Sequence, residues 1–166
     1  MIEVGKVDKS LIGDEYLKYP YLKQPIKDSE VKKWREQGYT HSSFTGALYG
    51  SKDPMPEWVT TISDLIGLKN CGYTFYMMNT LDIMPPHYDH FETYSRIFNV
   101  ERELVHRAIV FLEDWKPGHY FEYNGELMGK WRKGEYVLYS ADIEHAASNI
   151  GVEPRYTLQI TGTLVA

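Results

Sequence analysis

The 166-residue sequence has little of what several protein classes require. It contains a single cysteine, Cys71, so an internal disulfide framework is excluded. The sequence does not begin with a charged stretch followed by an apolar run, the pattern of a secretory signal. We therefore expect a reducing, cytoplasmic location. No apolar run approaches the roughly 20 residues of a membrane-spanning helix, so we expect no membrane partner. Lys and Arg (18) are outnumbered by Asp and Glu (23), and this net charge of −5 disfavours nucleic acid as a partner.

The sequence also lacks internal repeats, low-complexity tracts and any break in composition. We therefore predict one domain over residues 1–166, a length that can bury a substantial core. Its texture changes once along the chain. Residues 1–70 predict a helical N-terminal part, and residues 72–166 predict a β core.

Two segments of the N-terminal part show helical spacing of apolar residues. Residues 28–38, "DSEVKKWREQG", place Val31 and Trp34 on one face and end at a glycine. Residues 55–67, "MPEWVTTISDLIG", have a proline near the start, a longer apolar stripe and Gly67 as a stop signal. We expect two amphipathic helices that precede the β core.

From residue 72 onward the apolar pattern has a period of two and is interrupted by turn signals. The firmest of these signals is Asn124-Gly125, which is typical of a tight hairpin. The predicted strands are "GYTFYMMN", "LVHRAIVFL", "GHYFEYN", "GEYVLYS", "EHAASN" and "RYTLQITGTL". This pattern predicts a mainly β (α+β) fold in which N-terminal helices pack on an antiparallel sheet that closes into a barrel or two-sheet sandwich.

One short segment, "MPPHYDHFE", contains two overlapping pairs of potential metal ligands. In an extended chain, His87 and Asp89 project to one side, and His90 and Glu92 can do the same. A site of two histidines and one carboxylate, which leaves coordination positions open, needs one such pair and a distant histidine. His145 follows a predicted strand and turn that return the chain to the same end of the sheet. We favour His87 and Asp89, because the preceding Pro-Pro stiffens the chain at that point.

The last predicted strand has one polar face, formed by Arg155, Thr157, Gln159, Thr161 and Thr163. Such a face is compatible with exposure to solvent. It is also compatible with a cavity in which the Arg155 guanidinium grips a carboxylate and the Thr157 hydroxyl adds a hydrogen bond.

Together, His87-Tyr88-Asp89, His145 and Arg155-x-Thr157 resemble the H-x-D…H…R-x-S/T pattern of the Fe(II) and 2-oxoglutarate (2OG)-dependent oxygenases. The resemblance covers about half of the chain. It implies a double-stranded β-helix (a jelly roll, as in cupins) with Fe(II) bound by His87, Asp89 and His145. The cosubstrates would be 2OG and O2, with Arg155, Thr157 and Tyr76 binding 2OG.

The same resemblance implies hydroxylation of a small molecule or of an amino-acid or peptide side chain. The metal centre itself performs the chemistry, and no separate acid or base is assigned. Asp89 is present, whereas the halogenating branch of the family lacks this carboxylate. Prolyl hydroxylases usually have a lysine where this chain has Arg155, which puts a peptidyl-proline substrate in doubt.

Several roles and functions stay open at the level of sequence. Arg107 lies in an apolar strand and needs an anionic partner, which can be structural, the cosubstrate or the substrate. His90 and Tyr139 are further candidates for substrate or cosubstrate contact, and residues 90–105 and 40–55 are expected to be substrate-selecting loops.

The alternative functions are a non-redox, cupin-type metal-dependent isomerase and a small-ligand-binding protein. The segment Gly134–Asn149 partly resembles a cupin motif, and the many aromatic residues would suit a binding module for carbohydrate. The sequence does not indicate the primary substrate or the oligomeric state.

Overall fold

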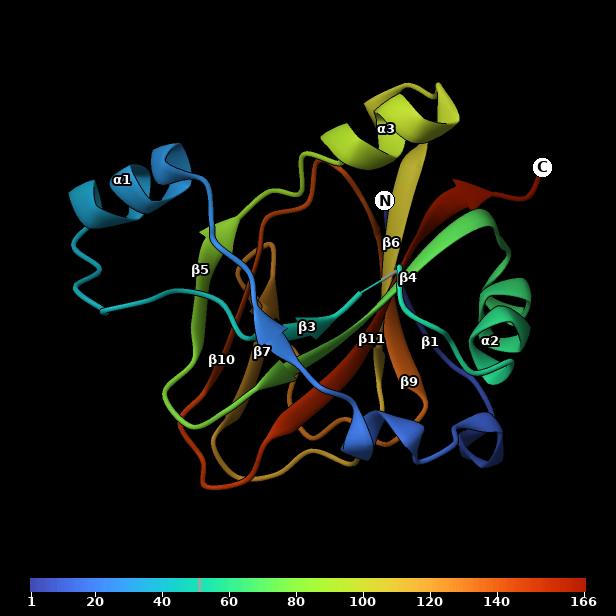
Figure 1. Ribbon diagram of the computed structural model, residues 1–166, viewed down its shortest axis with the longest axis horizontal. Helices are drawn as coiled ribbons and strands as arrows, with labels where there is room; N and C mark the ends of the chain where they lie inside the picture. The colour runs from blue at the N-terminus through green and yellow to red at the C-terminus, as the bar shows by residue number, and fades with distance from the viewer. Residues whose placement is uncertain (51) are drawn as a thin grey trace.

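The computed structural model describes residues 1–50 and 52–166. The described residues form eleven strands, three α-helices and three short 3-10 helices (Figure 1). The strands are β1 (Ile2–Lys6), β2 (Leu22–Lys23), β3 (Ala47–Tyr49), β4 (Leu68–Met78), β5 (Ile83–His87), β6 (Val105–Phe111), β7 (His119–Tyr123), β8 (Glu126–Leu127), β9 (Glu135–Ser140), β10 (His145–Asn149) and β11 (Arg155–Leu164). The helices are α1 (Asp28–Glu36), α2 (Trp58–Ile66), α3 (Glu92–Phe98), η1 (Lys9–Leu11), η2 (Glu15–Lys18) and η3 (Arg102–Leu104). None of these helices is both long and apolar enough to cross a membrane.

The strands form two antiparallel sheets. The larger sheet has the order β1-β9-β6-β11-β4-β3-β2, and the smaller sheet has the order β5-β10-β7-β8. From β4 onward the chain alternates between the two sheets, except at the hairpin from β7 to β8. Eight strands wound alternately into two sheets make a jelly roll, and the predicted double-stranded β-helix is confirmed.

Alternation along the strands of the larger sheet produces two apolar layers. In β6, Ala108 and Val110 pack on the outer side of the sheet, whereas Ile109 and Phe111 face the smaller sheet. In β9, Leu138 likewise packs on the outer side of the sheet, and Val137 faces the smaller sheet. Because both faces are covered, these strands have nearly continuous apolar sequences, and the inner layer surrounds the cavity described below.

The two predicted helices lie against different parts of this framework. Helix α2 buries Val59, Ile62 and Ile66 against the outer face of the larger sheet and ends at Gly67 in the left-handed conformation, as expected. Helix α1 instead lies beside the smaller sheet (Figure 1). There the Trp34 indole donates a hydrogen bond to the carbonyl of Pro86 over 3.2 Å.

The N-terminal part is not only helical, as predicted, because β1, β2 and β3 extend the larger sheet at its two edges. These strands are two to five residues long, and β1 pairs with β9 while β3 joins β4 to β2. In the β core, all six predicted strands are present. The Asn124-Gly125 hairpin is also confirmed, with φ of 47° and 74° at these two residues.

Candidate functional site

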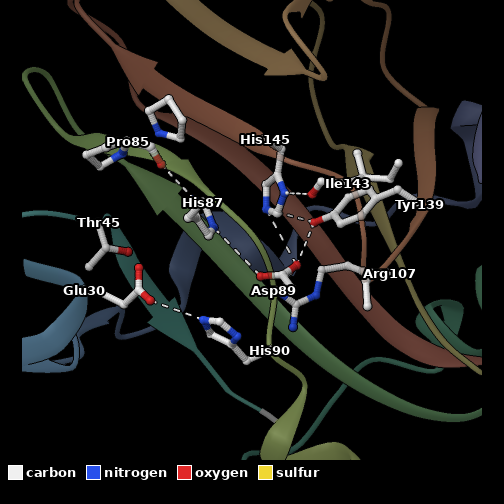
Figure 2. A network of polar contacts seen from close by, with 12 residues as sticks. Glu30, Thr45, Pro85, His87, Asp89, His90, Arg107, Tyr139, Ile143 and His145 are labelled. Atoms are coloured by element: carbon white, nitrogen blue, oxygen red, sulfur yellow. Dashed lines mark hydrogen bonds and ion pairs between the residues drawn. The ribbon is translucent and has the colours of Figure 1, made fainter. Parts of the chain in front are cut away.

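The three residues of the predicted metal triad meet where β5 and β10 pair. His87 ends β5, Asp89 follows two residues later, and His145 begins β10 opposite His87 in the register of the sheet. One potential ligand atom from each side chain lies within 4.8 Å of the others. The distances from Asp89 to the Nε2 atoms are 3.8 Å for His87 and 3.6 Å for His145 (Figure 2).

Backbone carbonyls fix the orientation of both imidazole rings. The Nδ1 atom of His87 lies 2.8 Å from the carbonyl oxygen of Pro85, and that of His145 lies 3.1 Å from the carbonyl oxygen of Ile143. A hydrogen on each Nδ1 satisfies these contacts and leaves the lone pair of Nε2 directed at Asp89. This arrangement is typical of metal-bound histidines in proteins.

Arg107 and Tyr139 hold the Asp89 carboxylate. Oδ2 accepts hydrogen bonds from Arg107 Nη1 over 2.9 Å and from the Tyr139 hydroxyl over 3.0 Å. Burial raises the pKa of Asp89, but the charge of Arg107 and the two nearby histidines outweigh it and bring the pKa to about 2. Asp89 is therefore ionised at neutral pH, and Oδ1 stays free of these two donors.

His145 is neutral at the same pH. Burial lowers its pKa to about 4, more than the Asp89 carboxylate raises it. Two imidazoles and one carboxylate form a donor set that suits Fe(II), Mn(II), Co(II) or Zn(II). The three side chains therefore fit the metal that the resemblance implies.

A cavity of about 170 Å³ extends from the triad between the two sheets. Its walls include the apolar side chains of Met84, Ile109 and Phe121, which the sequence did not single out because they look like ordinary core residues. At the far end lie Arg155 and Thr157, only 3% and 1% exposed. The part of the polar face of β11 formed by Arg155, Thr157 and Gln159 thus lines a cavity and is not directed at solvent.

Arg155 and Thr157 carry polar groups that the protein leaves unpaired. Among the described residues, no acceptor bonds Nε or Nη2 of Arg155, and no partner bonds the Thr157 hydroxyl. Burial lowers the pKa of Arg155 to about 10, and the guanidinium lies 5.3–5.7 Å from three aromatic rings. Such groups are costly to bury unless a ligand completes their hydrogen bonds.

Tyr76 lies across from Thr157 in the register of β4 and β11 and lines the same cavity. Its hydroxyl accepts a hydrogen bond from the Gly46 amide over 2.7 Å and lies 3.0 Å from the Thr45 hydroxyl. These contacts fix the ring at the cavity wall. Burial raises the pKa of Tyr76, so the phenol is neutral.

The second ligand pair of the segment does not converge on the triad. His90 Nε2 lies 3.2 Å from Glu30 of α1, and Glu92 forms an ion pair with Lys27 over 2.6 Å. Tyr88 is 42% exposed.

The loop expected over residues 90–105 is wrong in part, because Glu92–Phe98 form α3 and Arg102–Leu104 form η3. The second expected loop, residues 40–55, contains β3, and its residue 51 lies outside the described residues.

The sequence matches no protein-family model and no functionally curated protein. Its structure is similar to a Pseudomonas putida prolyl-4-hydroxylase, with a TM-score of 0.61, 14% identity, and coverage of 99% of this chain and 93% of that one. It is also similar to the viral collagen prolyl hydroxylase of Paramecium bursaria Chlorella virus-1 in its 2OG complex, with a TM-score of 0.58, 9% identity, and coverage of 98% and 96%. At these identities the similarity shows the fold alone. This chain therefore shares the double-stranded β-helix of these two hydroxylases over nearly its whole described length.

Proposed function

We propose that the protein is an Fe(II)- and 2OG-dependent oxygenase that hydroxylates a small molecule or an amino-acid or peptide side chain. One observation carries the proposal. A single cavity has a triad of two histidines and an ionised aspartate at one end and, at the other, a buried arginine with two nitrogens that no described residue bonds. The first end suits a divalent metal, and the second suits a carboxylate.

The size of the cavity favours a small diacid between these two ends. Its volume, about 170 Å³, is below the ~300 Å³ at which pockets for drug-sized ligands begin. A dicarboxylate can place one end at the metal and the other at Arg155 Nε and Nη2 and the Thr157 hydroxyl. 2OG has this chemistry, and the similar viral hydroxylase is described as a 2OG complex.

The residues of the chain would bind, orient and shield the reactants. His87, Asp89 and His145 would hold Fe(II), while Arg155, Thr157 and Tyr76 would hold 2OG. When bound, Fe(II) and 2OG would supply oxidative decarboxylation of 2OG to succinate and CO2. One oxygen atom of O2 would enter succinate, and the other would be inserted into a C–H bond of the substrate. The apolar walls at Met84, Ile109 and Phe121 would exclude water from this chemistry.

The prolyl substrate named for the similar hydroxylases is not carried over to this chain. The family resemblance implies that prolyl hydroxylases usually have lysine at the position of Arg155. The shared fold, in addition, does not determine the substrate. A non-redox, cupin-type isomerase would also bind a metal through the triad. It would not need 2OG, so the test must measure 2OG.

The experiment is calorimetric titration of 2OG into Mn(II)-loaded protein, compared with the Arg155→Ala variant. We expect the variant to bind 2OG roughly 10- to 100-fold more weakly, because a charge-assisted contact contributes about 1.5–3 kcal/mol. Arg132→Ala, which changes an arginine with a side chain 77% exposed, should bind 2OG like the unaltered protein. Absence of 2OG binding by the unaltered protein would overturn the proposal, and equal affinity in Arg155→Ala would remove Arg155 from the 2OG site.

A further inference from the structure

A second, larger cavity adjoins the metal end of the first one. Its volume is about 570 Å³, within the range of small-molecule sites. One wall is the inner face of the larger sheet, including Gly72, Thr74 and Thr161, and the other is α3 with Phe91, Tyr94 and Phe98. Arg107 lines both cavities and bonds Asp89, so the second cavity reaches the side chain that holds the carboxylate of the triad.

Arg107 is the charged group that this cavity offers to a ligand. Its Nε donates to Thr161 over 3.1 Å and its Nη1 to Asp89 over 2.9 Å, while within the described part of the chain Nη2 has no protein acceptor. The guanidinium lies 5.0 Å from the centre of the Phe91 ring. The other two charged side chains of the lining, Lys27 and Glu92, neutralise each other at 2.6 Å.

Charge balance indicates that the Arg107 guanidinium lacks a full counter-charge once Fe(II) and 2OG are bound. The charged side chains that line the first cavity are Arg107, Arg155 and Asp89, so the described part of the chain contributes one surplus positive charge there. Fe(II) and dianionic 2OG cancel each other. In the metal-free protein the surplus is at Arg155. After loading, one 2OG carboxylate neutralises Arg155, and Fe(II) draws on the charge of Asp89, so the surplus passes to Arg107.

We propose that the primary substrate is a small carboxylic acid with an apolar or aromatic body, whose carboxylate binds Arg107 from the cavity under α3. The inference rests on the proposed function, because the surplus charge at Arg107 arises only when Fe(II) and 2OG are bound. The Arg107 side chain is 22% exposed, and a largely buried cation without a counter-charge is costly. A carboxylate next to Arg107 removes that cost. The aromatic side chains of α3 and its N-terminal neighbour Phe91 provide the surface for the apolar body.

The register of the sheet provides a clean way to block this cavity. Gly72, Thr161 and Arg107 lie opposite one another on β4, β11 and β6. A Cβ at Gly72 would meet no atom within 4 Å, and its φ is outside the left-handed region. A leucine there would fill the cavity on the side of α3, away from Arg155.

The experiment measures binding of three probes that share one apolar body: 3-phenylpropanoate, 3-phenylpropanamide and 3-phenylpropylammonium. Each is titrated calorimetrically into anaerobic protein loaded with Fe(II) and 2OG. The acid should bind at least about tenfold more tightly than the amide, and the ammonium compound should not bind. The acid should also bind about tenfold more weakly to the metal-free protein, in which Asp89 neutralises Arg107.

Gly72→Leu should weaken acid binding at least about tenfold and leave 2OG binding unchanged. Gly129→Leu, at another glycine with open space around it, should change neither. Equal or tighter binding of the amide or the ammonium compound would overturn the inference, as would unchanged acid affinity in Gly72→Leu. The three-probe comparison needs no variant, so it tests the preference for a carboxylate even if Gly72→Leu does not fold. Failure of 2OG to bind would instead overturn the proposed function, and this inference with it.

Discussion

At the scale of single residues, the site depends on the different charge states of its ionisable groups. Asp89 is buried with an arginine and stays ionised, whereas His145 is buried and stays neutral. Arg155 is buried beside aromatic rings and forms no ion pair with any described residue. The first two residues are thereby ready to bind a cation and the third to bind an anion, which is why one cavity can take both.

The choice between the two overlapping ligand pairs can be tested by alanine substitution. We expect His87→Ala and Asp89→Ala to weaken Fe(II) binding by more than about 100-fold, since loss of an outer partner of a ligand alone costs about 10- to 100-fold. His90→Ala is the matched control, because His90 lies against Glu30 and away from the triad. Anaerobic equilibrium dialysis with Fe(II) measures all three. Loss of binding in His90→Ala with retention in His87→Ala would mean that the other pair forms the site.

The pKa of His145 predicts how the stability of the metal-free protein depends on pH. The pKa is about 4 in the folded chain against 6.5 for an ordinary histidine, so between these values the unfolded chain binds a proton that the folded chain does not. The free energy of unfolding should therefore fall as pH drops from 6.5 to 4, with about 3 kcal/mol due to this residue.

Urea denaturation at several pH values, in the presence of a chelator, measures this effect. His145→Gln cannot titrate and should show a shallower fall than the unaltered chain over the same interval. Identical pH dependence of the two proteins would contradict the burial of a neutral His145.

At the scale of secondary-structure elements, the sequence predicted what depends on local pattern. The six core strands and the helices α1 and α2 follow from apolar periodicity and from Gly and Pro signals. The short strands β1, β2, β3 and β8 depend on pairing with strands distant or adjacent in the chain, which the local pattern did not indicate. The sequence predicts a loop in place of helix α3, because this segment has no long stripe of apolar residues at helical spacing. The apolar contacts of the helix come from tertiary packing of Phe91 and Tyr94.

The end of α2 offers a test of this local reading. Gly67 has φ of 82°, and a Cβ there would meet nothing within 4 Å, so only backbone conformation opposes a side chain. Gly67→Ala should lower the free energy of unfolding by about 1 kcal/mol without changing 2OG affinity. Gly129→Ala, with open space and no left-handed φ, should stay within about 0.5 kcal/mol. Equal effects of the two substitutions in chemical denaturation would contradict this account.

At the scale of the whole molecule, the jelly roll brings together residues far apart in the sequence. The winding of strands between two sheets places His87 beside His145 and aligns Tyr76 with Thr157. The sequence identified the triad and Arg155 as candidates through their order and spacing, which resemble a known family pattern. It could not assign Arg107 to Asp89 or locate the cavity under α3, because both depend on the register of β6 against β9 and β11.

The central claim is that one cavity holds Fe(II) and 2OG together. Anaerobic titration of the Fe(II)-loaded protein with 2OG, followed by visible absorption, tests it most directly. We expect a weak charge-transfer band that grows to saturation with 2OG and is absent from the Zn(II)-loaded protein. A spectrum that stays unchanged at saturating 2OG would contradict the account.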